Sequence, residues 1–300
     1  MKNNFEVIII GGSYAGLAAA MALGRALRTV LIIDSGKPCN RQTPHSHNFI
    51  TQDGETPAAI SAKAKAQVLH YPTVQFLDAK ATNGNKTGEG FEINTDSGET
   101  FTAQKLLFAT GVKDIMPPVD GIADCWGISV IHCPYCHGYE VKGIRTAILA
   151  NGDAAYHYCM LLTQWTKELT VFSNGKCTLT GEQLAKLKAH KIDVIETEVT
   201  SLQQNNGQLE SITLVNGEIH LFTVMYYRAD FVQHSDIPKS LGCALNEQGF
   251  ITIDDMQKTS IPGIYAAGDC TTPMRAVAGA VAGGTKAGAI LNNDMAAEAF

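Results

Sequence analysis

Two closely spaced cysteines are the residues of this chain best suited to redox chemistry. Cys133 and Cys136 are separated by Pro134 and Tyr135, so their thiols can reach each other across one helical turn. At the start of a helix, the first thiol would be held partly as thiolate by the positive end of the helix. The spacing therefore predicts a pair that cycles between a disulfide and a dithiol.

Two other interpretations of this motif stay open from the residues alone. One is a zinc site in which the flanking His132 and His137 add ligands, and the other is a chance spacing among eight cysteines. A structural zinc site needs a second ligand pair at a similarly short spacing. The remaining cysteines instead occur singly, at Cys39, Cys125, Cys159, Cys177, Cys243 and Cys270. We therefore expect redox chemistry and no metal.

The composition is that of an ordinary globular protein. The chain has 300 residues, 45% of them hydrophobic and 17% charged, which suits a buried core and about two domains. A formal net charge of -6 and scattered Lys and Arg argue against a nucleic-acid partner. The apolar run from Val7 to Ile10 is too short for a signal peptide, and no later run reaches membrane-spanning length. We expect a cytoplasmic protein, where reducing conditions favour a cysteine pair that cycles.

The N-terminal segment has the pattern of a dinucleotide-binding unit. A β-branched run from Val7 to Ile10 predicts a buried strand, residues 17–27 predict a helix, and residues 29–33 predict a second strand that ends in Asp34. The glycine turn between strand and helix would face a pyrophosphate, and Asp34 would accept a hydrogen bond from a ribose hydroxyl. The candidate cofactor-binding residues here are Gly11, Gly12, Ser13, Ala15, Gly16, Asp34 and Ser35.

One position of this turn departs from the fingerprint, and the loop after it is irregular. Ser13 replaces the middle glycine, and we interpret it as an adaptation, because a small side chain still permits close backbone approach. Residues 35–54, rich in Pro, Asn, His and Gly, predict a loop over the cofactor. Within it, Arg41 either contacts a phosphate or is solvated. Beyond the loop, the sequence predicts a helix over 57–70 and short strands over 74–77, 91–95, 101–104 and 105–108.

Three motifs together resemble a known family. Ala109-Thr110-Gly111 closes a strand, the Cys133–Cys136 pair follows, and Ile264-Tyr265-Ala266-Ala267-Gly268-Asp269 comes near the C-terminus. In order and spacing these resemble the low-molecular-weight thioredoxin reductases over nearly the whole chain. The resemblance implies an α/β fold of two doubly wound, Rossmann-like domains: a discontinuous FAD-binding domain at 1–115 and 245–300, and an inserted NAD(P)H-binding-like domain at 116–244 that carries the cysteine pair.

The same resemblance implies roles for residues in the C-terminal part. Thr110 and Gly111 would lie along FAD, Gly268 would close the last motif, and Asp269 would hydrogen-bond the ribitol. A helix would begin at Arg275, Ala276 and Val277, with its N-terminal amides facing the flavin ring. The family also implies a homodimer. Small residues from Ala276 to Ala289 suit close helix packing, although an ordinary buried helix would show them too.

His137 occupies a position where the family has an acid–base residue. The family places an Asp directly after the second cysteine, whereas this chain has His137. An imidazole titrates near neutral pH, so it can move the proton of a thiol. We interpret Cys133, Cys136 and His137 as the catalytic set, with a plain surface histidine as the alternative for His137. His132 and His234 are weaker candidates, and a structural role is favoured for His234.

The inserted domain keeps the architecture of a dinucleotide fold but departs in its motifs. A strand over 145–150, a helix over 154–165 and a strand over 169–172 are predicted, yet the turn Ala150–Ala155 lacks its first glycine and adds Asp153. Ser173-Asn174-Gly175 replaces the family's His-Arg-Arg run for the 2′-phosphate of NADPH, and the later glycine turn is missing as well. Weak or no NADPH use is therefore expected, as in the flavin-dependent dithiol oxidases that this pattern resembles.

The resulting hypothesis is an FAD-dependent thiol–disulfide oxidoreductase. Electrons would pass between the flavin, the cysteine pair and a dithiol or disulfide substrate, either a thioredoxin-like protein or a small molecule. An ordinary NAD(P)H-dependent thioredoxin reductase is the first alternative. A flavin-binding redox sensor without turnover is the second. Neither the substrate nor the physiological electron donor or acceptor follows from the sequence.

Overall fold

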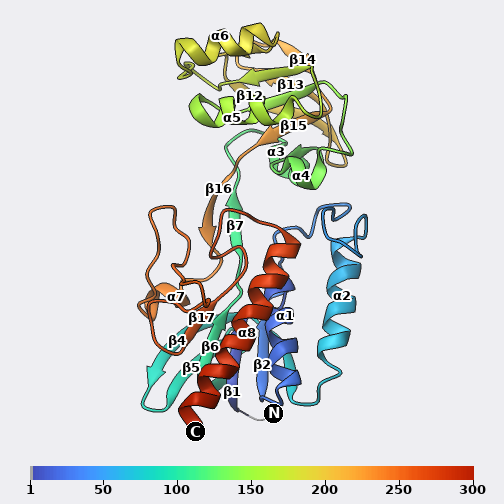
Figure 1. Cartoon of the computed structure of the whole chain (residues 1–300). Helices are drawn as coiled ribbons and strands as arrows, with labels where there is room; N and C mark the ends of the chain where they lie inside the picture. The colour runs from blue at the N-terminus through green and yellow to red at the C-terminus, as the bar shows by residue number, and fades with distance from the viewer. Residues whose placement is uncertain (1–2) are drawn as a thin grey trace. The chain divides into compact units, whose positions relative to one another are not determined.

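The computed structural model describes residues 3–300 and divides them into two compact units. Unit 1 contains the described residues up to Arg41, together with Asn48–Lys113 and Phe231–Phe300. Unit 2 contains Gln42–His47 and Asp114–Asp230. Both units combine parallel strands with helices (Figure 1), as the predicted α/β class requires. No helix among residues 3–300 is long and apolar enough to cross a membrane.

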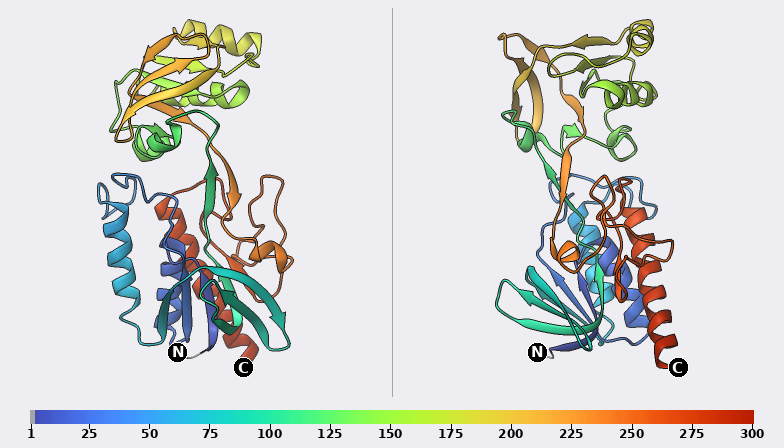
Figure 2. Two further views of the ribbon diagram at one scale, coloured as in Figure 1. Left: turned by 180° about the vertical axis from the view of Figure 1, so that it is seen from behind. Right: turned by 90° about the vertical axis from the view of Figure 1, so that its left-hand side faces the viewer.

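Unit 1 is built on a 7-stranded sheet in the order β3-β2-β1-β6-β5-β4, with β17 pairing to β6. The strands are β1 (Asn4–Ile10), β2 (Val30–Asp34), β3 (Val74–Asp78), β4 (Ala81–Thr87), β5 (Gly90–Thr95), β6 (Thr100–Phe108) and β17 (Ile264–Ala266). The helices are α1 (Tyr14–Arg25), α2 (Pro57–Val68), α7 (Ile237–Ser240) and α8 (Val277–Ala299). Strands β3, β2, β1, β6 and β17 are parallel, and β4 and β5 form an antiparallel hairpin that extends from β6 (Figure 2).

The buried strands of unit 1 explain why its helices pack where they do. Residues 7–10 of β1 and 30–33 of β2 are all buried, as β-branched and aliphatic side chains are when both faces of a sheet are covered. On one face, α1 and α8 pack against each other. Their close approach depends on small residues, because a Cβ added at Gly284 would collide with the carbonyl oxygen of Ala15.

The ends of several predicted elements differ in the structure. Helix α1 begins at Tyr14 because Ser13 already adopts the extended conformation of an N-cap, and it ends at Arg25 because Leu27 has a φ of 62°. Strand β4 was not predicted, since its polar sequence ATNGNKT does not alternate. The chain returns to unit 1 at Phe231, earlier than the expected 245, because Ile237 is buried in the core of this unit.

Unit 2 contains a 5-stranded sheet in the order β11-β10-β9-β15-β8 and a 3-stranded antiparallel sheet, β12-β13-β14. The strands are β8 (Val130–Ile131), β9 (Thr146–Leu149), β10 (Leu169–Phe172), β11 (Asp193–Ile195), β12 (Val199–Asn205), β13 (Gln208–Leu214), β14 (Ile219–Leu221) and β15 (Val224–Tyr227). The helices are α3 (Ile122–Cys125), α4 (Pro134–His137), α5 (Gly152–Leu162) and α6 (Gly181–Ala189). All the pairs of the larger sheet are parallel.

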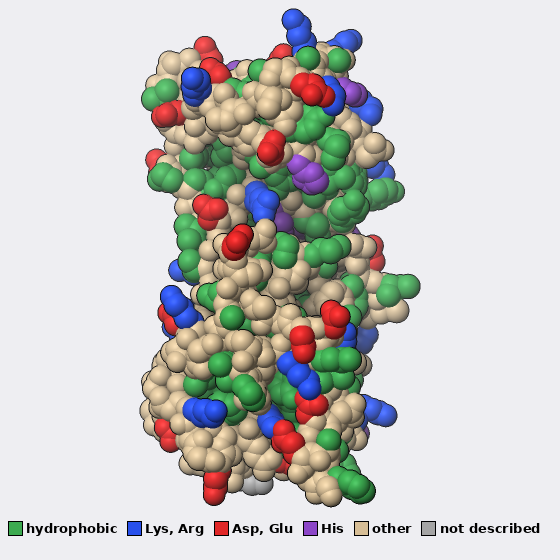
Figure 3. All heavy atoms as spheres, turned by 60° about the vertical axis from the view of Figure 1, so that its left-hand side comes forward, with side chains coloured by type: hydrophobic (Ala, Val, Ile, Leu, Met, Phe, Trp, Pro, Cys, Tyr) green, Lys and Arg blue, Asp and Glu red, His purple; other side chains and the backbone are tan. Residues whose placement is uncertain are grey.

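Two short strands carry the chain from one unit to the other. These are β7 (Val112–Ile115) and β16 (Asp230–Gln233), which pair with each other. On the face that Figure 3 shows, acidic and basic side chains of the described residues are interspersed and form no large patch of one sign. Such a mixed distribution is not the electrostatic footprint of a nucleic-acid-binding surface.

Candidate functional site

The glycine turn of unit 1 brings three distant parts of the chain together. Gly11 follows β1 with a φ of 105°, and a Cβ there would collide with the carbonyl oxygen of Ala109, at the end of β6. Gly268 follows β17, and a Cβ there would lie 3.0 Å from the Cβ of Ala15 in α1. Three segments predicted from sequence motifs therefore meet at the carboxyl ends of parallel strands, where ligands bind in open α/β sheets.

Asp34 is held beside this turn by backbone hydrogen bonds. Its Oδ1 accepts from the backbone nitrogen of Gly12 at 2.9 Å, and its Oδ2 accepts from that of Gly36 at 3.2 Å. A Cβ at Gly16 would collide with the carbonyl oxygen of Gly11, so the first turn of α1 must approach β1 through glycine. The fixed carboxylate and the open helix end form a preorganised place for a ribose and a pyrophosphate.

The other predicted residues of unit 1 lie near the same edge of the sheet. Asp269 contacts one of them, Arg275, whose Nε lies 3.6 Å from its Oδ2, and the same oxygen lies 3.6 Å from Sγ of Cys39, which was not a predicted site residue. Ala276 is the N-cap of α8, which begins at Val277 as predicted from the sequence. Arg41, for which a phosphate contact and solvation were both left open, is exposed, and its guanidinium donates to the carbonyl oxygen of Pro38 at 3.2 Å.

The cysteine pair of unit 2 forms a disulfide at the start of a short helix. Cys133 is the N-cap of α4, and its Cα lies 5.2 Å from that of Cys136, within the usual range for a disulfide. The carbonyl oxygen of Cys133 accepts from the nitrogens of Cys136 and His137. Both cysteines are partly exposed, so a substrate thiol can reach them. Within residues 3–300, no three His, Cys, Asp or Glu side chains are grouped to bind a metal.

His137 is partly buried at the end of α4, in a setting that keeps it neutral. Burial lowers the pKa of its imidazole, the negative charge of Glu140 acts to raise it, and His47 acts to lower it, with a lowered pKa as the net result. At neutral pH the ring is therefore uncharged and can accept a proton. This environment is suited to a base that takes the proton of a thiol.

Aromatic side chains belong to the segment that carries the disulfide or pack against it. Tyr135, between the two cysteines, is 63% exposed and meets the ring of Trp165 edge-on at 5.8 Å. Tyr139 is 69% exposed, with the ammonium of Lys142 over its ring. On another side, His132 stacks on Trp126 at 5.7 Å, so we assign it a packing role and not a catalytic one. A substrate that reaches the disulfide meets a largely aromatic rim.

The second dinucleotide turn, at the start of α5, is occupied by the protein's own side chains. Asn151 caps α5, and its Oδ1 accepts from Gly152 N at 2.8 Å, Thr178 N at 2.8 Å and Thr178 Oγ1 at 3.1 Å. Its Nδ2 donates to the carbonyl oxygen of Lys176 at 2.8 Å. Asp153, in the first turn of α5, accepts from Gln183 Nε2 at 2.8 Å. The backbone nitrogen of Gly152, a donor at the start of α5, is thus already used by the protein itself.

Two carboxylate side chains lie near the turn after β10, which corresponds to the family's His-Arg-Arg run for the 2′-phosphate of NADPH. After β10, the hydroxyl of Ser173 donates to the carbonyl oxygen of Gly175 at 2.7 Å, which folds the segment back on itself. Glu196 Oε1 accepts from Cys177 N at 2.8 Å, and Glu198 lies beside Gly175. Two acidic side chains therefore lie against this turn.

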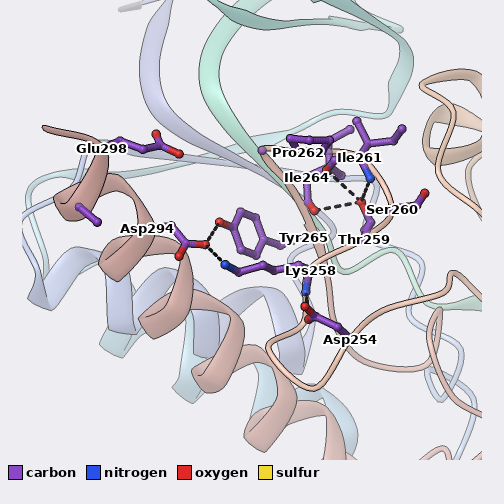
Figure 4. A pocket seen from close by; sticks show the side chains of 12 residues that line it. Asp254, Lys258, Thr259, Ser260, Ile261, Pro262, Ile264, Tyr265, Asp294 and Glu298 are labelled. Atoms are coloured by element: carbon purple, nitrogen blue, oxygen red, sulfur yellow. Dashed lines mark hydrogen bonds and ion pairs between the residues drawn. The ribbon is translucent and has the colours of Figure 1, made fainter.

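A separate pocket of about 570 Å³ lies in unit 1 at the C-terminal end of α8 (Figure 4). Within it, Asp294 accepts from the hydroxyl of Tyr265 and pairs with Lys258 Nζ at 2.7 Å. Close by, Lys105 Nζ pairs with Glu298 at 2.6 Å. Because these groups form ion pairs and hydrogen bonds with one another, we interpret them as a polar cluster that fixes α8 to β17.

Comparison with known proteins decides the family. The family model described as pyridine nucleotide-disulphide oxidoreductase matches residues 5–284. The chain belongs to this family. It is 29% identical over 309 residues to the thioredoxin reductase sirT of Leptosphaeria maculans, a match that covers 96% of this chain and 93% of that protein.

Solved structures agree with this assignment. A Bacillus anthracis protein assigned as the thioredoxin reductase TrxB has a TM-score of 0.95 and 30% identity, with 99% of this chain and 100% of that chain covered. An oxidoreductase from Agrobacterium tumefaciens has a TM-score of 0.91 and 35% identity, with 98% and 99% covered. The resemblance to thioredoxin reductases and the two-domain α/β fold are confirmed, and this pyridine nucleotide-disulphide oxidoreductase is an enzyme.

Two features of the site were not found from the sequence. His47 and Glu140, whose side chains lie 3.5 Å apart, were not considered together because they are far apart in the chain. Asn151 was given no role in a turn whose missing first glycine is Ala150, whereas its side chain accepts hydrogen bonds from Gly152 N and Thr178 N. The carboxamide at an N-cap position was the available signal, because Asn is a preferred helix cap.

Proposed function

We propose that this oxidoreductase uses FAD and the Cys133–Cys136 pair to oxidise a dithiol substrate, with weak or no use of NADPH. The observation that carries this proposal is the arrangement of unit 2, where an accessible disulfide lies beside a neutral histidine. The dinucleotide turn of the same unit is closed by Asn151. Unit 1 would be the FAD-binding domain, and unit 2 would present the disulfide.

The residues of unit 1 fit the ADP half of FAD. The turn requires glycine at Gly11 and Gly16, because a Cβ at either position would collide with backbone atoms, and Asp34 is oriented for a ribose hydroxyl. Thr110, Gly111, Gly268 and Asp269 would lie along the rest of the cofactor. When bound, FAD supplies a two-electron acceptor that regenerates the disulfide and passes the electrons to oxygen, giving hydrogen peroxide.

The residues of unit 2 carry the thiol chemistry. A substrate thiolate attacks one sulfur of the Cys133–Cys136 bond, that bond breaks, and a mixed disulfide forms. The second substrate thiol, which loses its proton to the neutral imidazole of His137, then attacks the mixed disulfide. The substrate leaves as a disulfide, having lost two electrons and two protons, and the enzyme pair holds the electrons as a dithiol.

The partner is a dithiol, either a small molecule or a thioredoxin-like protein. The aromatic rim of Tyr135, Tyr139 and Trp165 favours a substrate with an apolar body near its sulfurs. Family resemblance favours a homodimer, which sedimentation velocity measures directly.

The decisive experiment follows the flavin spectrum without oxygen. A dithiol such as dithiothreitol should bleach the flavin rapidly, and NADPH should not. On admission of oxygen, the wild type should release one peroxide per dithiol oxidised, while Cys136→Ser should release none. Rapid bleaching by NADPH would overturn the proposed electron source.

A second candidate is an NAD(P)H-dependent thioredoxin reductase. The relatives that are named thioredoxin reductases favour it. Bleaching by NADPH together with reduction of a thioredoxin disulfide would establish this alternative. An unchanged response of Cys133→Ser to dithiol would instead point to a flavin-binding sensor that does not use the cysteine pair.

A further inference from the structure

His137 and Glu140 lie on one side of the same turn. Helix α4 ends at His137, but Gly138 keeps helical dihedral angles (φ -64°, ψ -31°), and the chain continues in turns beyond Glu140. Residues three positions apart on a helical turn have neighbouring side chains. Gly138 is required for this geometry, because a Cβ there would lie 2.5 Å from the carbonyl oxygen of Pro134 and 2.9 Å from the ring of Trp165.

A second histidine reaches this turn from a distant part of the sequence. The segment Gln42–His47 belongs to unit 2, although the chain on both sides of it belongs to unit 1. Gln42 and Thr43 lie against Gly127, where an added Cβ would be 3.1 Å from each side chain. His47 Nε2 lies 3.5 Å from Glu140 Oε1, and the two side chains are 19% and 40% exposed.

Two buried tyrosines of unit 2 are further titratable groups in this part of the fold. Tyr226 of β15 and Tyr158 of α5 have their rings 5.8 Å apart, and burial raises the pKa of both hydroxyls. The charge of Glu140 also acts to raise the pKa of Tyr226, and Arg228 acts to lower that of Tyr158. Among the described residues, Glu140 acts to raise the pKa of His137 and His47 acts to lower it.

We propose that Glu140 and His47 are a pair of positioning residues that control the charge of His137 from opposite directions. The carboxylate of Glu140 stabilises an imidazolium at His137, because opposite charges attract across a partly buried site. His47 opposes it in two ways: it neutralises Glu140 through their contact, and it repels His137 when protonated. The role of the pair in catalysis rests on the proposed function, whereas the electrostatic coupling itself does not.

Because of this coupling, the charge of His137 depends on the carboxylate of Glu140 and on the contact that His47 makes with it. When His137 has taken the proton of a substrate thiol, Glu140 holds the new positive charge. The contact of His47 with the same carboxylate leaves less negative charge to hold a proton on His137.

The test measures the titration of His137 directly in the flavin-bound protein. Isotope-labelled histidine gives nine imidazole signals, and the signal missing from His137→Asn identifies the residue. Glu140→Gln should move the midpoint of His137 to lower pH, and His47→Asn should move it to higher pH. Glu218→Gln is the matched control, since Glu218 pairs with His220 at 3.6 Å elsewhere in unit 2, and it should leave the midpoint of His137 unchanged.

The opposite signs separate this proposal from a merely structural role. Shifts of the same sign, or none, in the two variants would overturn it, as would an equal shift in Glu218→Gln. Glu140→Asp retains the carboxylate, so its His137 midpoint should lie closer to the wild-type midpoint than that of Glu140→Gln if charge is the cause. The pH profile of dithiol-dependent flavin reduction should move with each midpoint. If no dithiol reduces the flavin at any pH, the proposed function fails, yet the midpoints still decide the coupling.

Discussion

The carboxylate of Asp34 accepts a hydrogen bond from the backbone nitrogen of Gly12 at 2.9 Å, and so fixes the glycine turn to the end of β2. Both groups are therefore oriented before any ligand arrives. Preorganisation of this kind lowers the cost of binding.

Removing this carboxylate should weaken cofactor binding. We predict that Asp34→Ala lowers flavin affinity about tenfold or more, because a hydrogen bond to a charged group contributes roughly 1.5–3 kcal/mol. The ratio of flavin to protein absorbance after purification and dialysis measures the effect. Asp34→Asn keeps an acceptor oxygen and should retain more flavin. Equal flavin content in Asp34→Ala and the wild type would contradict the assignment of unit 1.

Helix packing in unit 1 should be sensitive to a single methyl group. Gly284→Ala places a Cβ against the backbone of Ala15, so we predict a loss of about 1–3 kcal/mol in the free energy of unfolding. Urea denaturation gives the value. Gly181→Ala is the control, because a Cβ at that helix position meets nothing within 4 Å. Similar stabilities for both variants would show that α1 and α8 can separate at no cost.

The interactions of Asp294 with Lys258 and Tyr265 near the end of α8 should contribute less stability at acidic pH. Partial burial alone would raise the pKa of Asp294, but hydrogen bonds from Lys258 and Tyr265 lower it below the usual 3.8. A carboxyl group with a lowered folded-state pKa stabilises the fold above its unfolded pKa, and this contribution disappears as pH falls through the folded value. We predict that Tyr265→Phe costs about 1 kcal/mol at pH 7 and less at strongly acidic pH. Urea midpoints at both pH values make the comparison, and an equal loss at both would exclude an ionised Asp294 as the partner.

Tyr158, which hydrogen-bonds the residue directly before Cys133, should make the stability of the protein depend on alkaline pH. Its hydroxyl donates to the carbonyl oxygen of His132 at 3.0 Å, and burial raises its pKa to about 12. An acid with a raised folded-state pKa stabilises the fold below its unfolded value of 10.0, and the contribution disappears as pH rises toward 12. We predict that Tyr158→Phe makes the stability of the protein less dependent on pH between these values. An unchanged alkaline profile of urea midpoints would show that Tyr158 does not ionise on unfolding.

The sequence predicted best those helices, strands and turns whose signal lies in adjacent residues. The strand, turn and helix around Gly11 follow from adjacent residues, as does the position of α4, whereas the start of α8 at Val277 was implied by the family resemblance. Strand β4 escaped prediction because its pairing with β5, and not its own composition, makes it a strand. The contact of His47 with Glu140 escaped as well, since it depends on where a loop of irregular sequence folds in space.

The order of the strands in unit 1 has a consequence for how the protein is synthesised. Strand β17, which pairs with β6, and helix α8, which packs on α1, leave the ribosome after the other strands of this sheet and after residues 114–230. Until then, one edge of β6 and the apolar face of α1 lack their partners. Residues 114–230 form most of a compact unit and are complete earlier. A nascent chain stalled before residue 264 should therefore hold a folded unit 2 and recruit chaperones to an unfinished unit 1.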